Sequence, residues 1–411
     1  MVKESKDLPR FLALGALTAL SVGVSATTFR ALKPAEKVPP LDGFDGKPPG
    51  GKWPFISVIV PSRNEERNLP VLLPTLLQQR YPNYEVIVVD DQSSDTTPQI
   101  LADFATRESR LKVVHGAELP RDEGWLGKPY AMHQGAQQAE GEWLLFTDAD
   151  TTHSPLSLSS AVAYALEHDV DLLTILPHSE LGSPAERLLM PVAFQGIATF
   201  YPSGKVNDPH SKVAIANGQF LLIRRTVYDA VGGIGRVKRK IAEDLEFAKA
   251  VKGDGYRLFL ADGRDLMSVR MYTNLPELWE GWSKNVVLSF GDNPLVGVGG
   301  VLGIVAALGV PPAMLRWTVR TWRRASDSRR PADRVTAVWL GALTTWAIAT
   351  PLAYRRQLDK MLGLSAGWTL TYPLGVLLFG FILLNSAVRL LLGRGVVWKG
   401  RTYAARAGTG T

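Results

Sequence analysis

The sequence predicts an α/β fold with a doubly wound, mainly parallel sheet, and with apolar helices near both ends of the chain. Two observations predict it. Between about residues 55 and 265, short apolar runs alternate with helical segments, which is typical of a parallel sheet covered on both faces. Toward both ends, long apolar stretches have the length of membrane-spanning helices.

The alternating region begins with residues 55–60, an apolar run that we expect to be a buried strand ended by Pro61. Further strands are expected at 84–89, 111–114, 143–147 and 170–176, and helices at 69–79, 96–108, 129–139 and 155–167. Open α/β sheets bind ligands beyond the carboxyl ends of their strands. The residues that follow each strand are therefore the first candidates for a site.

The apolar ends of the chain predict membrane attachment. We expect residues 1–32 to form an N-terminal anchor around the apolar run 11–29, with a cleaved signal peptide as the alternative. The Pro/Gly-rich residues 33–54 are expected to be a semi-extended tether to a globular domain at 55–290. The remaining residues, 291–411, are expected to form a membrane region. Its three apolar segments are 294–315, 335–353 and 367–388.

Two arginine clusters bear on the topology of this membrane region. One lies between the first two apolar segments, and the other follows the third. If the globular domain is cytoplasmic and all three segments cross, both clusters fall outside, against the positive-inside rule. A re-entrant or interfacial segment at 294–315, broken at Pro311 and Pro312, would place both clusters inside. We favour that arrangement, with three plain spans as the alternative.

Composition excludes several classes of chemistry. The chain has a net charge of +7, and much of its excess lysine and arginine flanks the apolar ends. This favours anionic lipid headgroups as partners, and no basic-aromatic motif indicates nucleic acid. The chain has no cysteine, which rules out disulfides, zinc–thiolate sites and cysteine nucleophiles.

Paired acidic side chains are the most informative feature of the globular region. Two pairs follow predicted strands, and a third opens a later helical stretch. They are Asp90 with Asp91, Asp148 with Asp150, and Glu243 with Asp244. Neighbouring carboxylates repel each other unless a cation or a proton compensates. The pattern therefore indicates a metal-dependent enzyme that handles an anionic substrate.

Four motifs in order make the region similar to a family 2 glycosyltransferase of GT-A fold. They are residues 61–66 (PSRNEE), 88–95 (VVDDQSSD), 147–150 (TDAD) and 242–244 (AED). The resemblance covers residues 55 to about 290. With its flanking apolar segments, the chain resembles the membrane-bound branch that glycosylates carotenoids, hopanoid-type terpenoids or glycerolipids.

The resemblance implies a metal site at the DxD motif. Asp148 is expected to contact the donor, and Asp150 to bind Mg²⁺ or Mn²⁺ that bridges the donor diphosphate. His153 is a further candidate ligand, since imidazole is acceptable to Mn²⁺. The alternatives are an Asp pair that caps the following helix and a histidine in a surface turn.

The resemblance also implies how the donor is held, and we expect this donor to be a nucleotide-sugar, specifically a UDP-sugar. Asp90 and Asp91 are expected to bind its base and ribose, and Pro61 and Glu65 to wall the base. The alternative is a turn in which Asp95 caps a helix.

Two further residues are expected to contact the donor. Lys128, at a helix start, would pair with phosphate, in a stretch where His133 replaces the family's usual Asn. Gly218 would let the backbone approach the sugar closely. A solvated lysine and a bulge in a strand are the alternatives.

Asp244, beside Glu243, is expected to be the general base of a one-step inverting transfer. An acidic pair favoured by the helix dipole is the alternative, and it is compatible with that role. Trp282 and Lys284 lie where processive relatives carry QxxRW, of which only the Trp is matched, so long-chain polymer synthesis is disfavoured. These two residues are expected either to serve substrate, Trp282 in an acceptor pocket and Lys284 on the diphosphate, or to lie at the membrane interface.

The sequence thus predicts a multi-pass protein of the cell membrane with a cytoplasmic catalytic domain. It would transfer a sugar from a nucleotide-sugar to a lipid of the bilayer, with a carotenoid or related terpenoid as the first candidate acceptor. The alternatives are a transferase for polyprenyl phosphate or a short saccharide, and a non-catalytic membrane protein that binds nucleotide-sugars.

Overall fold

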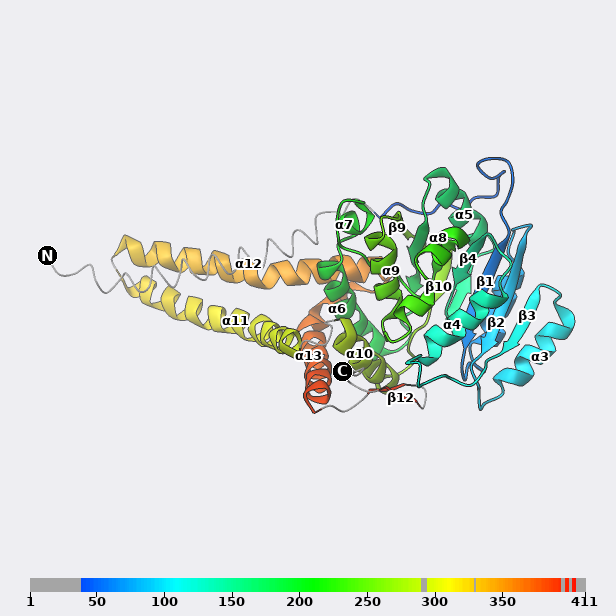
Figure 1. Ribbon diagram of the computed structural model, residues 1–411. Coiled ribbons are helices and arrows are strands. Elements are labelled where there is room, and N and C mark those ends of the chain that lie inside the picture. The colour runs from blue at the N-terminus through cyan, green and yellow to red at the C-terminus, as the bar shows by residue number, and fades with distance from the viewer. Residues whose placement is uncertain (1–37, 290–293, 329, 393–395, 399–400, 404–411) are drawn as a thin grey trace. The chain divides into compact units, whose positions relative to one another are not determined.

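The computed structural model describes residues 38–289, 294–328, 330–392, 396–398 and 401–403 (Figure 1). The chain divides into two compact units. Among the described residues, the sheet unit contains 38–181, 201–273, 396–398 and 401–403. The helical unit contains the described residues of 182–200 and 274–392. The expected N-terminal anchor lies outside the described residues.

The sheet unit is built on a seven-stranded sheet with the order β3-β2-β1-β4-β8-β6-β9 (Figure 1). Its strands are β1 (Ile56–Ser62), β2 (Tyr84–Asp90), β3 (Leu111–His115), β4 (Trp143–Phe146), β6 (Leu172–Leu176), β8 (Leu221–Arg224) and β9 (Leu258–Asp262). All neighbours are parallel except β8, which runs antiparallel to both β4 and β6. The predicted mainly parallel α/β sheet is therefore confirmed.

Helices cover both faces of this sheet because alternate strand residues point to opposite sides. In β1, Val58 and Val60 join one apolar cluster, whereas Ile59 joins the other. The first cluster includes residues of α2 (Leu69–Leu77), α3 (Thr97–Arg107) and α5 (Ser157–Glu167). The second includes residues of α4 (Gly127–Gln138), α8 (Arg225–Ala230), η1 (Ile234–Val237) and α9 (Glu243–Gly253).

Smaller elements complete the sheet unit. A three-stranded sheet has the order β5 (Thr151–His153), β10 (Met267–Val269) and β7 (His178–Ser179). The others are α7 (Ser203–Asn207) and the two-stranded pair β11 (Val396–Trp398) and β12 (Arg401–Tyr403).

One local expectation for this unit was wrong. β1 does not end at Pro61 but continues to Ser62. Past Ile59 it pairs only with β2, so a residue without an N–H is tolerated there.

The described part of the expected tether packs against the sheet unit at Leu41. This residue is 4% exposed, lies in the core, and its N–H donates to the carbonyl oxygen of Asp262 at 2.8 Å.

The helical unit contains α6 (Pro184–Phe200), α10 (Leu275–Ser289), α11 (Pro294–Asp327), α12 (Pro331–Met361), η2 (Ala366–Thr371) and α13 (Tyr372–Leu391). Within the part of the chain that the structure describes, three helical stretches are long and apolar enough to cross a membrane: 299–327, 331–361 and 366–389. The expected break at Pro311 and Pro312 is absent, because α11 runs through both prolines as one helix. Apolar helices tolerate proline where neighbouring helices pack against them, as α12 and α13 do here.

Candidate active site

Several of the predicted site residues of the sheet unit lie where parallel strands end. Asp90 is the last residue of β2, and Asp148 follows the end of β4 by two residues. β1 lies between these two strands in the sheet, so its own end, at Ser62, faces the same edge. The sequence argument from strand ends therefore placed these groups correctly on the same edge of the sheet.

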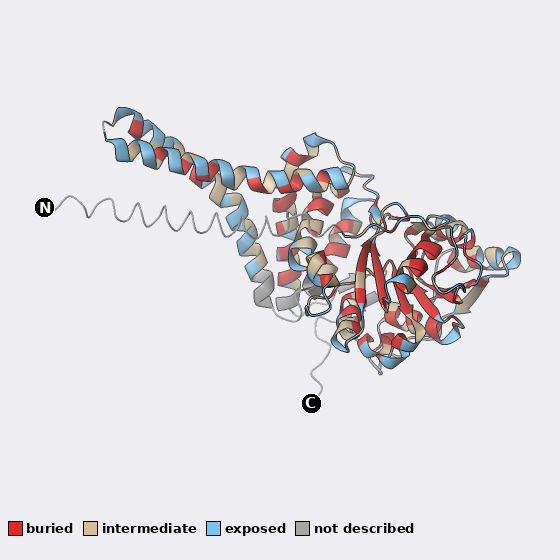
Figure 2. Cartoon of the chain, turned by 90° about the horizontal axis from the view of Figure 1, so that it is seen from above, coloured by how far each residue is buried: buried red, intermediate tan, exposed pale blue. Residues whose placement is uncertain are grey.

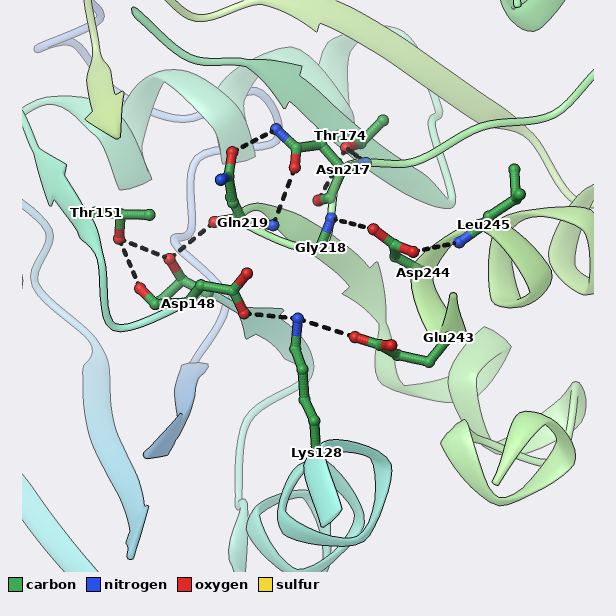
Figure 3. A network of polar contacts seen from close by, with 11 residues as sticks. Lys128, Asp148, Thr151, Thr174, Asn217, Gly218, Gln219, Glu243, Asp244 and Leu245 are labelled. Atoms are coloured by element: carbon green, nitrogen blue, oxygen red, sulfur yellow. Dashed lines mark hydrogen bonds and ion pairs between the residues drawn. The ribbon is translucent and has the colours of Figure 1, made fainter. Parts of the chain in front are cut away.

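Lys128 connects two of the acidic pairs. It is the second residue of α4, and its Nζ lies 2.8 Å from Asp148 Oδ1 and 2.8 Å from Glu243 Oε1 (Figure 3). Burial opposes the charge of this ammonium group, but the carboxylates of Asp148, Glu243 and Asp244 raise the pKa of Lys128 well above its usual value. It therefore remains a cation among three carboxylates.

Asp244 is held by two backbone N–H groups. Gly218 N–H donates to its Oδ2 at 3.0 Å, and Leu245 N–H donates to its Oδ1 at 2.7 Å (Figure 3). Burial, followed by the charge of Glu243, raises the pKa of Asp244 to about 6, although Lys128 and the two N–H groups act in the opposite direction. A carboxylate with this pKa is suited to accept a proton near neutral pH.

Gly218 makes this arrangement possible by lacking a side chain. A Cβ at this position would lie 3.1 Å from Asp244 Oδ2 and 3.2 Å from Lys128 Nζ. The sequence predicted close approach of the Gly218 backbone to a sugar. The structure shows close approach to the carboxylate and the ammonium group.

A polar network that the sequence did not reveal holds the loop before β8. The N–H of Asn217 donates to Thr174 Oγ1 at 2.9 Å, and its amide Nδ2 donates to Gln219 Oε1 at 2.9 Å. Thr147 Oγ1 donates to the carbonyl oxygen of Gln219 at 2.8 Å. Gly218 lies between these fixed residues, as Figure 3 shows. Thr174 and Thr147 are 43 and 72 residues from their partners in this network, so no local motif marks these two contacts.

Buried acidic residues also gather at the ends of β1 and β2. Asp90, Asp91 and Glu65 are 6%, 4% and 8% exposed. Asp90 Oδ1 accepts the N–H of Ser93 at 3.1 Å, and Glu65 Oε2 accepts from Asn68 Nδ2 at 2.7 Å. These carboxylates supply acceptors for the N–H and O–H groups of a ligand.

Pro61 and Arg63 belong to the same region of the sheet unit. Pro61 pairs in register with Val89 of β2. Arg63 Nη1 donates to the carbonyl oxygen of Asp91 at 2.6 Å, which ties the loop after β1 to the loop after β2. The first and second motifs of the sequence therefore form one connected structure.

His153 is engaged by hydroxyl groups on both ring nitrogens. Its Nε2 lies 3.2 Å from Thr147 Oγ1 and 3.1 Å from Thr151 Oγ1, and its Nδ1 lies 3.4 Å from Ser157 Oγ. Burial lowers the pKa of His153 to about 3, so the ring is neutral. These contacts favour a structural role for His153 over the metal role expected from the sequence.

Asp148 and Asp150 remain the oxygen donors suited to a divalent ion. Within the described residues, no group of three or more His, Cys, Asp or Glu side chains is placed to share a metal. A Mg²⁺ ion bound through one or two carboxylates and substrate phosphates does not need such a group. The buried Tyr272, which no motif indicated, lies near Asp150, and burial together with that charge raises the pKa of its hydroxyl.

Trp282 and Lys284 lie in α10 of the helical unit. Trp282 is 8% exposed, its Nε1 donates to Met190 Sδ at 3.3 Å, and its ring meets the ring of Phe379 edge-on at 5.8 Å. This buried packing differs from that of an exposed interfacial side chain. Lys284 is half-buried. The substrate-binding roles of both residues stay predictions.

Comparisons with known proteins show which sequences this chain resembles. Residues 57–232 match the family described as Glycosyl transferase family 2. Over 256 residues the chain is 30% identical to 4,4'-diaponeurosporenoate glycosyltransferase of Staphylococcus haemolyticus (strain JCSC1435), an alignment that covers 60% of this chain and 65% of that protein. The protein of the same name from Staphylococcus aureus (strain MRSA252) is 28% identical over 239 residues, with 56% and 60% covered. The chain thus spans slightly less than two thirds of the length of these relatives.

A solved structure shares the fold. It is a mannosyltransferase from Pyrobaculum calidifontis in complex with GDP-Man and Mn²⁺. The two chains are 21% identical and superpose with a TM-score of 0.52 over 92% of this chain and 97% of the other. At this identity the likeness supports the GT-A architecture alone.

Proposed function

We propose that the protein is an inverting glycosyltransferase, because residues 57–232 match the family described as Glycosyl transferase family 2. In this proposal it moves a sugar from a nucleotide-sugar to a carotenoid or related terpenoid lipid. The observation that carries the mechanism is the position of Asp244, a carboxylate with a pKa of about 6 fixed by Gly218 N–H beside the Lys128 cation. The relatives named above motivate the choice of acceptor.

The chemistry is a single displacement at the anomeric carbon. The acceptor oxygen forms a bond to that carbon while the bond to the diphosphate oxygen breaks, which inverts the configuration. Asp244 takes the proton of an acceptor hydroxyl during the attack. Lys128 pairs with Asp148 and Glu243 in the free protein and is placed to offer its charge to the leaving diphosphate.

Asp150 and Asp148 are the residues that we propose to hold a divalent ion with the diphosphate. Two carboxylates two residues apart suit a hard cation that takes its remaining ligands from phosphate and water. When bound, Mg²⁺ or Mn²⁺ neutralises charge on the leaving group. Asp90, Asp91, Glu65 and Pro61 are proposed to hold the nucleoside.

The chemical nature of the acceptor group decides how much Asp244 matters. A hydroxyl must lose a proton, so it needs a base. The relatives' printed name describes a carboxylate acceptor, which is already ionised at neutral pH and loses no proton. In that case Asp244 would have no proton to accept, and its replacement by Asn would cost much less activity.

The test uses the full chain in vesicles of native lipid. Radiolabelled nucleotide-sugars are supplied with Mn²⁺ or Mg²⁺, and the products are extracted into organic solvent. We expect label in the organic phase, and its loss in Asp244→Asn identifies a hydroxyl acceptor. The control is Asp229→Asn, which alters an exposed carboxylate paired with Arg225. Label in aqueous saccharide would favour a saccharide transferase. Donor binding without transfer would favour a binding protein.

A separate experiment tests whether Asp150 or His153 binds the divalent ion. Removal of divalent ions with a chelator is expected to abolish transfer, and added Mn²⁺ or Mg²⁺ to restore it. Asp150→Asn should raise the metal concentration needed for half-maximal activity. His153→Ala should leave that concentration unchanged if the ring serves the fold. A rise in that concentration in His153→Ala, with no rise in Asp150→Asn, would instead support His153 as a metal ligand.

A further inference from the structure

We propose that the distal part of the hairpin formed by α11 and α12 binds the headgroups of anionic phospholipids. We define the distal hairpin as residues 314–328, which are the end of α11 and the residue after it, and residues 330–346, which are the residue before α12 and its first half. The proposal rests on a basic stripe that runs beside an exposed apolar stripe along the same helix. It does not depend on catalysis, and its test needs no sugar donor.

The two stripes follow from helical spacing in α11. Leu315, Val319 and Trp322 recur at intervals of four and three residues and are 49%, 42% and 55% exposed. One position further along, Arg316, Arg320 and Arg323 repeat the same spacing, and all three are exposed. At 3.6 residues per turn, each set occupies one line along the helix, and the two lines are adjacent.

A third face of α11 packs against α12. Met314 and Ala325 are 2% and 4% exposed. Thr318 Oγ1 lies 2.7 Å from Thr344 Oγ1 and donates to the carbonyl oxygen of Leu340 at 3.2 Å. Packing within the hairpin therefore uses a face of α11 that contains neither stripe.

α12 adds apolar surface to the distal hairpin. Val335, Val338 and Trp339 are 57%, 58% and 57% exposed. Figure 2 shows exposed, intermediate and buried residues intermixed along the long helices. Each of the two helices thus contributes an exposed tryptophan, Trp322 and Trp339, and tryptophan is enriched where membrane meets water.

The positive charge of the three arginines favours anionic phospholipid as the binding partner. Among the described residues, none of Arg316, Arg320 and Arg323 forms an ion pair, so their guanidinium groups are available to phosphate oxygens. An apolar stripe beside a basic stripe is the pattern of a helix at a bilayer surface, where anionic lipid strengthens binding. A soluble polyanion would satisfy the arginines but leave Leu315, Val319 and Trp322 in water.

The absence of cysteine gives a clean test, because one introduced cysteine can carry a fluorophore without background labelling. Ser326→Cys places an environment-sensitive probe on the exposed apolar side, one turn after Trp322. The full chain is reconstituted in phosphatidylcholine vesicles with and without phosphatidylglycerol. We expect a blue shift of the emission that grows with the phosphatidylglycerol fraction and disappears in high salt.

The variant R316Q/R320Q/R323Q, with the same probe, is expected to lose the response to phosphatidylglycerol. The control K47Q/K52Q/R80Q removes the same charge from exposed positions of the sheet unit and should keep it. Identical emission of the unaltered chain in both lipids would overturn the proposal. So would a phosphatidylglycerol response in the arginine variant equal to that of the control. The salt dependence of the unaltered chain decides the matter even if that variant fails to fold.

Discussion

Lys128 and Asp244 are coupled by charge, and this coupling predicts a pH dependence. The pKa of Asp244 is about 6, and its ionised form is the base in the proposed mechanism. With a hydroxyl acceptor, kcat/KM should therefore fall as the pH drops through about 6 and level off above it. Lys128 lowers that pKa, so Lys128→Met should move the acidic limb to higher pH. Lys128→Arg keeps the charge and should leave the limb in place.

The measurement is kcat/KM against pH for the three proteins at saturating metal. Asp244→Asn should reduce kcat by about 10²- to 10⁴-fold, the usual contribution of a general base. A limb that stays at the same pH in Lys128→Met would show that another group than Asp244 controls it.

Gly218→Ala tests the close approach directly. The new methyl group would press on Asp244 Oδ2 and Lys128 Nζ, which are the ends of flexible side chains, so the fold should survive while the two charges move. We expect kcat to fall by up to about 100-fold, the effect of a small misplacement of reacting groups. Gly253→Ala is the matched control, because nothing lies within 4 Å of its added Cβ. Equal activity of the two variants would contradict the role given to Gly218.

At the scale of elements, a buried ion pair holds α12 to α6 within the helical unit. Arg355 and Asp359 are both fully buried, and Arg355 Nε donates to Asp359 Oδ1 at 2.7 Å. The same guanidinium donates to the carbonyl oxygens of Arg187 and Leu188 at 2.8 and 3.1 Å. Arg355 therefore replaces water for two carbonyl groups of α6 while it neutralises Asp359.

Arg355→Met should destabilise the protein by about 3–5 kcal/mol, because it leaves Asp359 buried without a counter-charge. Asp359→Leu should do likewise by leaving Arg355. The double variant should lose less than the sum of the two, since neither charge is then stranded. Thermal unfolding of the full chain in detergent measures all three. Additive losses would mean that the pair is not coupled.

Strands and helices with strong apolar patterns could be predicted from sequence, and elements defined by distant partners could not. β2 and α3 lie within a residue of their expected ends, because their periodicity is local. The insertion of β8 between β4 and β6 depends on pairing across distant segments, which no local pattern contains. The same holds for α6, whose 17 residues interrupt the sequence of the sheet unit yet belong to the helical unit.

The candidate site likewise contains residues that the sequence predicted and contacts that it did not. The DxD carboxylates and Asp244 were found because short motifs mark them. The hydroxyl partners of His153 are Thr147, Thr151 and Ser157, which are close to it in sequence, but the sequence does not show that this buried segment folds so that all three face the ring. Sequence spacing alone suggested a ligand, whereas packing favours a structural group.

At the scale of the whole molecule, the three apolar helices among the described residues and the proposed lipid acceptor predict how the reaction responds to dilution. An enzyme held in a bilayer meets its acceptor by diffusion within that bilayer, so the rate depends on the acceptor's mole fraction in the lipid. Diluting vesicles at a fixed mole fraction should leave turnover per enzyme unchanged. Adding inert lipid to the same vesicles should lower it.

The two manipulations separate a membrane-held acceptor from one taken out of water. The measurement is the initial rate with saturating nucleotide-sugar, first in a dilution series and then in a series of lipid compositions. A rate that fell with vesicle dilution would mean that the acceptor reaches the site through the aqueous phase, and the apolar helices would then serve anchoring alone. A rate that follows only the mole fraction would place acceptor capture in the membrane, where a terpenoid chain need not be transferred into water before the sugar is attached.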